Sequence, residues 1–332
     1  MQSQRLNPTR LRISVFLVGI LFIIALLLLR SAYAPEQLDI DITVITEPEG
    51  YNPLVMPFFP TFENVHMLAT REALETYLYE IDETAYVFTS DLDIPGFLNM
   101  DFRLEPRPAE DGPRVLIFHT HSQEAFINSR PGEVSDTIVG VGALLAEILA
   151  KEYGIPVVHD QGRYDIVGGV EHRTGSYERM EPAIRNLLHK YPTIEVVIDL
   201  HRDSVPYGVH LLKDINGLPT ARIMFFNGIT RLNQNGKPID VLEFPNPYVH
   251  ENMGLSLQMQ LMSNTLYPGF ARNIYIKPYR YSLHFMPRSL LIEVGAENNT
   301  IEEARNAMLP LAEILARVLF PSVNQAYSRG PV

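Results

Sequence analysis

The chain has 332 residues, of which 46% are hydrophobic and 20% are charged, and its formal net charge is -12. This composition supplies enough apolar residues for a large folded core, arranged as two domains or as one domain with extensions. The negative charge argues against a nucleic-acid-binding protein, because contacts with phosphates require a basic surface. Cysteine is absent, which excludes disulfides, thiolate metal sites and cysteine nucleophiles. Any metal must therefore be bound by His, Asp or Glu.

The N-terminal segment predicts a membrane anchor. Residues 1–12 contain three arginines, and an unbroken apolar run from Ile13 to Leu29 follows, so the predicted anchor covers residues 13–30. A run of this length reaches the lower limit for crossing a bilayer, and the basic flank is expected to stay in the cytoplasm. The sequence AYA at 32–34 also resembles a signal-peptide cleavage site, but Pro35 and the length of the run favour a retained anchor. Under both interpretations the rest of the chain lies outside the cytoplasm.

Residues 31–113 are predicted to form a membrane-proximal region and a linker. The segment 48–60 is rich in proline and is expected to be irregular. Residues 62–81 contain helix formers at helical spacing and are predicted to be a helix. The segment PRPAEDGP at 106–113 combines Pro, Gly and charge and is typical of a linker. We therefore predict the main domain boundary at residue 113.

Residues 114–320 alternate between strand-like and helix-like segments, followed by a short C-terminal tail over 321–332. This alternation predicts an α/β fold with three layers, α/β/α, built on a mostly parallel twisted sheet. In such sheets ligands bind beyond the carboxyl ends of the strands. The predicted strands are 114–119, 155–159, 194–200, 207–212, 221–227, 274–277 and 289–294, and the predicted helices are 136–153, 177–190, 250–266 and 300–319.

Three apolar runs end on side chains that can bind a metal or transfer a proton. The run RVLIF is followed by His119, His121 and Glu124, EVVIDL by His201, and SLLI by Glu293. Because a parallel sheet brings the ends of its strands to one edge, we expect these side chains to meet. Two histidines and one carboxylate with an open fourth position form a catalytic zinc site. A further carboxylate can act on the metal-bound water.

Several nearby residues are candidates for supporting or substrate-binding roles. Asp199 is a candidate partner for a ligating histidine, and Arg202 either binds substrate carboxylates or forms a salt bridge with Asp203. His172 and His284 lie in polar segments that can line a cleft. The sequence contains no GxSxG, P-loop or GxGxxG motif that would indicate another chemistry.

The sequence resembles the stage II sporulation protein P family of membrane-anchored cell-wall hydrolases from endospore-forming bacteria. The resemblance implies a role in remodelling the wall during sporulation, with peptidoglycan as substrate and stage II sporulation proteins D and M as possible partners. It covers about residues 114–320 and rests on the segments HTHSQEAF, RTGSYERM, YPTIEVVIDLHRDS, IYIKPYRYSLHFMPRSLLIEVGAENNT and EEARNAMLPLAEILARVL.

The pattern is also similar to zinc-dependent N-acetylmuramoyl-L-alanine amidases. That resemblance implies a Zn²⁺ enzyme that cuts the amide between muramic acid and the stem peptide, and the family also implies cleavage of cross-linked stem peptides. Either His121 or His119 would be the first ligand, and Glu124 or Glu133 the carboxylate ligand. The segment YSLHF departs from the Asn-Gln pair of the family, which affects expected substrate contacts.

The sequence thus predicts metal-assisted amide hydrolysis. His121 or His119, Glu124 and His201 would hold zinc, and Glu293 would act as general base and then general acid. Two alternatives remain open: an inactive scaffold that binds the wall, and another exported metallopeptidase.

Overall fold

A computed structural model describes residues 43–45 and 58–321. The predicted cytoplasmic tail 1–12, the predicted anchor 13–30 and residues 322–332 lie outside this described part of the chain. Within the described part, none of the helices combines the length and the apolar character needed to cross a membrane.

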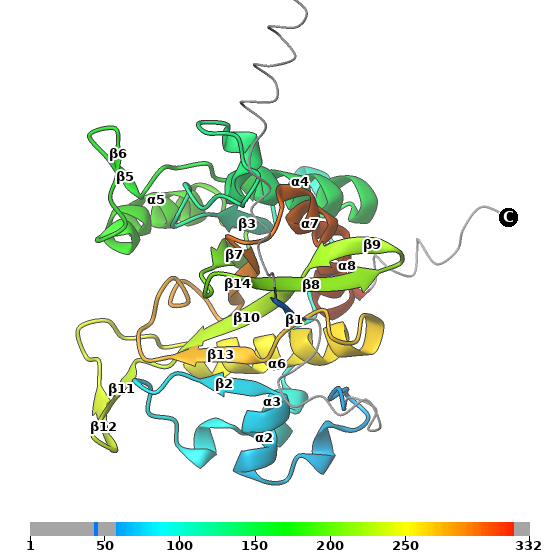
Figure 1. Ribbon diagram of the computed structural model, residues 1–332, viewed down its shortest axis with the longest axis vertical. Helices are drawn as coiled ribbons and strands as arrows, with labels where there is room; N and C mark the ends of the chain where they lie inside the picture. Colours follow the sequence, from blue (N-terminus) through cyan, green and yellow to red (C-terminus); the bar gives the residue numbers. More distant parts are fainter. Residues whose placement is uncertain (1–42, 46–57, 322–332) are drawn as a thin grey trace, which may run out of the picture. The chain divides into compact units, whose positions relative to one another are not determined.

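A seven-stranded sheet organises the fold (Figure 1), with the strand order β2-β13-β10-β14-β7-β3-β4. Every neighbouring pair is parallel except β10 and β14, which run antiparallel. The predicted α/β class with a mostly parallel sheet is therefore confirmed. The strands are β2 Tyr79–Ile81, β3 Val115–Phe118, β4 Val157–His159, β7 Val196–Asp203, β10 Ile223–Gly228, β13 Ile274–Lys277 and β14 Ser289–Ala296.

Helices α4, α6 and α8 cover one face of the sheet and form the larger core. Alternate strand residues such as Ile117, Ile198 and Ile292 are buried against them, as the two-residue period of a strand requires. Helix α4 begins after Thr137, whose hydroxyl accepts a hydrogen bond from the Val139 N–H. The bounds are α4 Ile138–Tyr153, α6 Val249–Leu266 and α8 Met308–Leu319.

Helix α5, Ser176–Lys190, packs on the opposite face through a smaller core. Leu116 and Phe118 of β3 contact this helix side, where Met180 and Ile184 are fully buried. Strand β7 alternates in the same way, so its residues Val197, Asp199 and His201 share this face. The smaller core leaves room beside α5 for polar side chains, and the candidate site lies there.

The remaining elements extend the sheet or join its strands. Strands β1, β8 and β9 form a three-stranded sheet, and β5–β6 and β11–β12 are two-stranded. These elements are β1 Thr43–Ile45, β5 Ile166–Val167, β6 Val170–Glu171, β8 Val209–Ile215, β9 Leu218–Ala221, β11 Arg231–Gln234, β12 Lys237–Asp240, α2 Arg71–Tyr77, α3 Ile94–Asn99, α7 Ile301–Asn306, and the 3-10 turns η1 Val65–Met67, η2 Thr89–Asp91, η3 Ala109–Asp111 and η4 Val134–Asp136.

Two helices predicted from the sequence differ in the structure. The helix predicted over 62–81 is reduced to α2, and the chain then enters β2, which pairs with β13 at the edge of the main sheet. The sheet thus includes residues upstream of the boundary predicted at 113. The helix predicted over 300–319 is interrupted at Ala307, because Pro310 has no N–H to donate to the carbonyl of Asn306.

Gly142 of α4 allows the helix to pack closely against His119, the residue that follows β3. A Cβ atom at position 142 would lie 2.5 Å from both Cε1 and Nε2 of His119. Alanine normally favours a helix over glycine by about 1 kcal/mol, but overpacking a core costs about 1–3 kcal/mol. We expect Gly142→Ala to lower the free energy of unfolding by up to about 2 kcal/mol, measured by urea denaturation.

The double variant His119→Ala/Gly142→Ala is the control. Because the clash is with the imidazole, Gly142→Ala should become neutral or stabilising in the His119→Ala background. An equal loss of stability in both backgrounds would contradict this explanation.

Candidate active site

The pairing of β14 with β7 sets Glu293 beside His201. These two residues are partners in the parallel register of the two strands. They share the α5 face with Asp199, two residues earlier on β7. The chain thus places one imidazole and two carboxylates together without any contribution from a flexible loop.

The loop after β3 is fixed to the same region by two aspartates. Asp199 accepts hydrogen bonds from the backbone N–H of Thr120 at 2.9 Å and from its hydroxyl at 2.7 Å. Asp165 accepts one from the Ser122 hydroxyl at 2.6 Å. Between these anchors, the ring of His121 lies with its centroid 5.3 Å from that of His201.

Glu124 is buried next to His201, with 3.3 Å between its Oε2 and Nδ1 of the imidazole. Oε1 contacts Nη2 of Arg173 at 2.6 Å, and Oε2 accepts the backbone N–H of Arg202 at 3.0 Å. Burial by itself would raise the pKa of Glu124, but the charge and hydrogen bond of His201, with His121 and the Arg202 N–H, lower it to about 2. Glu124 is therefore ionised at neutral pH.

His201 lies between two carboxylates. Its Nε2 is 2.8 Å from Oδ1 of Asp199, and its Nδ1 faces Glu124. Burial opposes a charged imidazole, yet Asp199 and Glu124 together raise the pKa of His201 well above its usual value. As it stands, His201 is an imidazolium.

His121 and Glu293 each present a buried polar atom without a partner. Neither Nδ1 of His121 nor Oε2 of Glu293 has a hydrogen bond within the described residues. Burial and the charge of His201 lower the pKa of His121 to about 4, so this imidazole is neutral. Burial raises the pKa of Glu293 to about 8; the nearby charge of Glu124 adds to this rise and that of His201 opposes it. Buried polar groups normally have a partner, so these two atoms are available to a group bound at the site.

The donor set is chemically suited to zinc, although it is not arranged as a completed metal centre. Among residues 43–45 and 58–321, no group of three or more His, Asp or Glu side chains stands in an arrangement that could hold a metal ion. The chemistry of the set still matches, since His121, Glu124 and His201 supply two imidazoles and a carboxylate. Two of these, Glu124 and His201, are in direct contact, and His121 has its Nδ1 free.

His119 lies apart from this group, on the α4 face. Its Nδ1 contacts the carbonyl oxygen of Leu200 at 2.8 Å, and its Nε2 contacts Nε2 of His159 at 2.9 Å. Burial lowers the pKa of His119 to about 3. The strand period explains the difference, because His119 continues the side of β3 that carries Ile117, whereas the chain turns before His121. Of the two alternatives for the first ligand, only His121 faces His201.

The other predicted residues occupy varied positions. Arg202 is used structurally, since its Nε donates to the carbonyl of Ala125 at 2.9 Å. Of the two roles suggested for Arg202, the salt bridge with the Asp203 carboxylate is not formed: Arg202 donates to the carbonyl oxygen of Asp203 at 3.1 Å, and the Asp203 carboxylate pairs with Arg272 at 2.5 Å. His172 is exposed beside β6. Glu133, the alternative to Glu124, is exposed immediately before η4, whereas Glu124 is buried against His201.

Two contributors were not singled out from the sequence. Arg173 pairs with Glu124, and Tyr177 lies with its ring centroid 5.7 Å from that of His121. Both belong to the segment RTGSYERM, whose match to the family was the only available signal. His284 lines a cleft beside Tyr177, together with residues that include Glu181 and Arg280.

One curated protein is similar in sequence to this chain. The curated stage II sporulation protein P of Bacillus subtilis (strain 168) is 22% identical over 227 residues, which are 61% of this chain and 50% of that protein. The chain therefore matches about half the length of this curated relative.

Solved structures give only weak similarity. An N-acetylmuramoyl-L-alanine amidase from Clostridium difficile 630 is 16% identical with a TM-score of 0.36, covering 66% of this chain and 100% of that one. The CwlD amidase from Clostridioides difficile, solved in complex with the GerS lipoprotein, is 13% identical with a TM-score of 0.34, covering 65% and 98%. At these scores the similarity carries no conclusion about the site.

The family model described as Stage II sporulation protein P (SpoIIP) matches residues 77–316. This segment contains His121, Glu124, His201 and Glu293 and extends over more than half of the chain. The protein is therefore a member of the stage II sporulation protein P family.

Proposed function

We propose that this protein is an exported, zinc-dependent peptidoglycan hydrolase that cleaves the amide bond between muramic acid and L-alanine. The observation that carries the proposal is the convergence of His121, Glu124, His201 and Glu293 from three separate segments of the chain. Membership of the stage II sporulation protein P family supports a role in wall remodelling during sporulation. Cleavage of cross-linked stem peptides belongs to the same proposal.

Zinc would be held by His121, Glu124 and His201. When bound, the metal would polarise the scissile carbonyl and lower the pKa of the attacking water to about 7. The unpartnered Nδ1 of His121 supports this assignment, because a buried imidazole nitrogen without a partner is costly. Asp199 is the neighbour of His201 and keeps its ring in place.

Glu293 is the proposed proton carrier. Its carboxylate would accept a proton from the attacking water and deliver that proton to the departing amine. The elevated pKa of Glu293 reflects burial and surrounding negative charge. The charge of a zinc ion held by His121, Glu124 and His201 would lower the pKa of Glu293. The Glu293 carboxylate would then be ionised and able to accept a proton.

The proposed location is the outer face of the cell membrane. The apolar residues 13–30, preceded by arginines, support a single anchor with its N-terminus inside. Peptidoglycan is the proposed substrate, and stage II sporulation proteins D and M are proposed partners on the basis of the family alone.

Digestion of intact sacculi tests the proposal as a whole. The fragment from residue 31 onward, which keeps β1, should release stem peptides with a free L-alanine amine, identified by mass spectrometry. Release of peptides cut within the stem alone would indicate another metallopeptidase. Absence of any product from zinc-loaded protein, with or without the D and M proteins, would instead favour an inactive scaffold.

We expect one zinc ion per chain and a large loss of zinc from His201→Ala. A three-residue site loses one of its donors in this variant, and elemental analysis after dialysis measures the content. Because Asp199 and Glu124 keep His201 protonated, zinc must displace a proton, so affinity should rise with pH. The control is His189→Ala, which changes an exposed histidine on α5. Unchanged zinc content in His201→Ala would refute the site.

Comparing His121→Ala with His119→Ala separates the two candidate ligands. We expect His121→Ala to lose zinc. His119→Ala should keep zinc but lose about 1–3 kcal/mol of stability, because Leu200 O and His159 Nε2 are left unpaired. Zinc content and urea denaturation give the two readouts. The reverse pattern would mean that the α4 face holds the metal.

Glu293→Gln tests the proton carrier. Glutamine keeps the size of the side chain but cannot accept the proton of water, so turnover should fall by about 10²–10⁴-fold. Zinc content and binding to sacculi should match those of the unaltered protein. Loss of zinc would make Glu293 a ligand, and near-normal turnover would remove it from the mechanism.

A further inference from the structure

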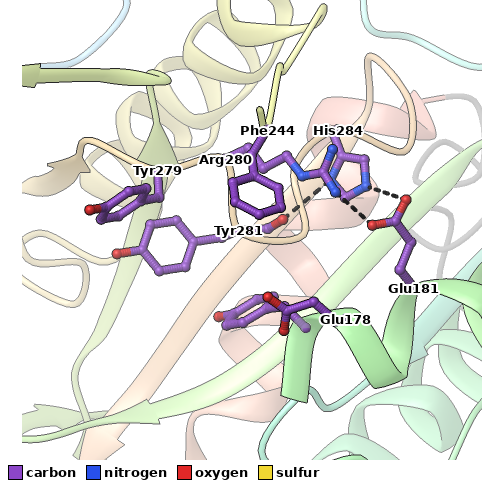
Figure 2. A pocket seen from close by; sticks show the side chains of 8 residues that line it. Glu178, Glu181, Phe244, Tyr279, Arg280, Tyr281 and His284 are labelled. Atoms are coloured by element: carbon purple, nitrogen blue, oxygen red, sulfur yellow. Dashed lines mark hydrogen bonds and ion pairs between the residues drawn. The ribbon is translucent and has the colours of Figure 1, made fainter. Parts of the chain in front are cut away.

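A cleft lined by aromatic side chains opens beside the candidate active site (Figure 2). It encloses about 230 Å³, which is enough for one amino-acid side chain. Phe244 and Arg280 lie on one side, and Glu178 projects from α5 on the other. The lining residues are Tyr177, Glu178, Glu181, Phe244, Tyr279, Arg280, Tyr281 and His284.

Tyr177 forms the wall between this cleft and the active site. Its ring centroid lies 5.7 Å from that of His121 on one side and 5.6 Å from that of Tyr281 on the other. A ligand bound at the active site and extending past the ring of Tyr177 would therefore enter the cleft.

The charges in the cleft leave one carboxylate without a partner. Arg280 donates to Glu181 at 2.6 Å, and its guanidinium carbon lies 5.3 Å from the centroid of the Phe244 ring. Burial and the charge of Arg280 lower the pKa of His284, which is therefore neutral. Glu178 is exposed, and its side chain forms no hydrogen bond or ion pair with any residue in the described part of the chain.

Aromatic walls with one free carboxylate are suited to a particular chemical group. Aromatic faces attract an ammonium ion within about 6 Å and pack against methylene groups. A carboxylate at the end of the cleft would complete the contact by a charge-assisted hydrogen bond. An aliphatic side chain ending in an ammonium has both properties.

We propose that this cleft receives the amine-bearing side chain of a diamino acid in the peptidoglycan stem peptide, with its ammonium on Glu178. The proposal rests on the proposed hydrolase function and deepens it. A stem peptide that can be cross-linked must contain a second amino group, since its only α-amine is used in the bond to muramic acid. The cleft would thus favour stems whose diamino acid is still free over stems already cross-linked through that amine.

The dimensions agree with such a contact. Three extended residues span roughly 10 Å, which separates the scissile amide from the third residue of a stem peptide. The ring-to-ring steps through Tyr177, of 5.7 and 5.6 Å, place Tyr281 in the cleft wall within that span of His121. The diamino acid at the third position is therefore the residue that would occupy the cleft.

Calorimetric binding of uncleavable tripeptides to the full chain tests the inference separately from hydrolysis. The ligands are L-Ala-γ-D-Glu-L-Lys, its Nε-acetyl form and the tripeptide with meso-diaminopimelate. We expect acetylation to weaken binding by about 1.5- to five-fold, the size of one exposed ion pair. Tighter binding of the diaminopimelate peptide would assign its extra carboxylate to Arg280, and tighter binding of the lysine peptide would assign the cleft to lysine-type walls.

Glu178→Gln supplies the decisive variant. In this variant the ratio of the affinities for the free and the acetylated peptide should fall to about one. The control is Glu152→Gln, which changes an exposed carboxylate on α4 and should leave this ratio unchanged. Equal binding of free and acetylated peptides to the unaltered protein would overturn the inference, as would displacement of the lysine peptide by N-acetylglucosamine oligomers. If the protein binds the free-amine peptide more tightly but does not digest sacculi, only the proposed hydrolase function is refuted. If it digests sacculi but binds both peptides equally, only the assignment of the cleft is refuted.

Discussion

The candidate site depends on Asp199, a fully buried carboxylate in the middle of the sheet. It accepts two hydrogen bonds from Thr120 and contacts the imidazole of His201, so one side chain joins the end of β3 to the end of β7. Burial opposes its ionisation, but His201 and Thr120 lower the pKa of Asp199 below its usual value. A charge held in this way determines where His121 lies, because His121 follows Thr120 directly. Replacing Asp199 with an apolar residue would leave Thr120 and His201 unpaired in the interior, which is costly.

Charges of opposite sign alternate through the site. Arg173, Glu124, His201 and Asp199 form a continuous series of contacts in which each carboxylate has a cationic neighbour. Glu293 differs from them, since burial and the nearby carboxylates outweigh the charge of its neighbour His201, and its Oε2 has no partner in the described residues. Its pKa therefore rises to about 8 while that of Glu124 falls to about 2. Two carboxylates in one site with pKa values moved in opposite directions are typical of a division into a charge-binding group and a proton carrier.

The two faces of the sheet have different tasks. The α4, α6 and α8 face is filled mainly by apolar side chains. Of the polar pairs on it, Asn227 donates to Ser256 at 2.6 Å, and His119 and His159 fit because Gly142 has no side chain. The α5 face carries a smaller apolar core and leaves the strand ends accessible to polar groups. The aromatic cleft lies on this same face, with Tyr177 shared between cleft and site. The larger apolar core thus lies on one face of the sheet, and the candidate active site lies on the other.

The sequence by itself determined the α/β class, the parallel strands β3, β7 and β14, and the gathering of Glu124, His201 and Glu293, because apolar runs and the residues that end them are local features. It could not choose between His119 and His121, since both follow the same strand and only the turn at Thr120, held by Asp199, sends them to opposite sides. Strand β2 was missed because three residues carry no clear period, and its position depends on pairing with β13, far away in the chain. Arg173, Tyr177 and the aromatic cleft came only from the tertiary structure. Their roles arise from contacts between segments separated by dozens of residues, which no local pattern records.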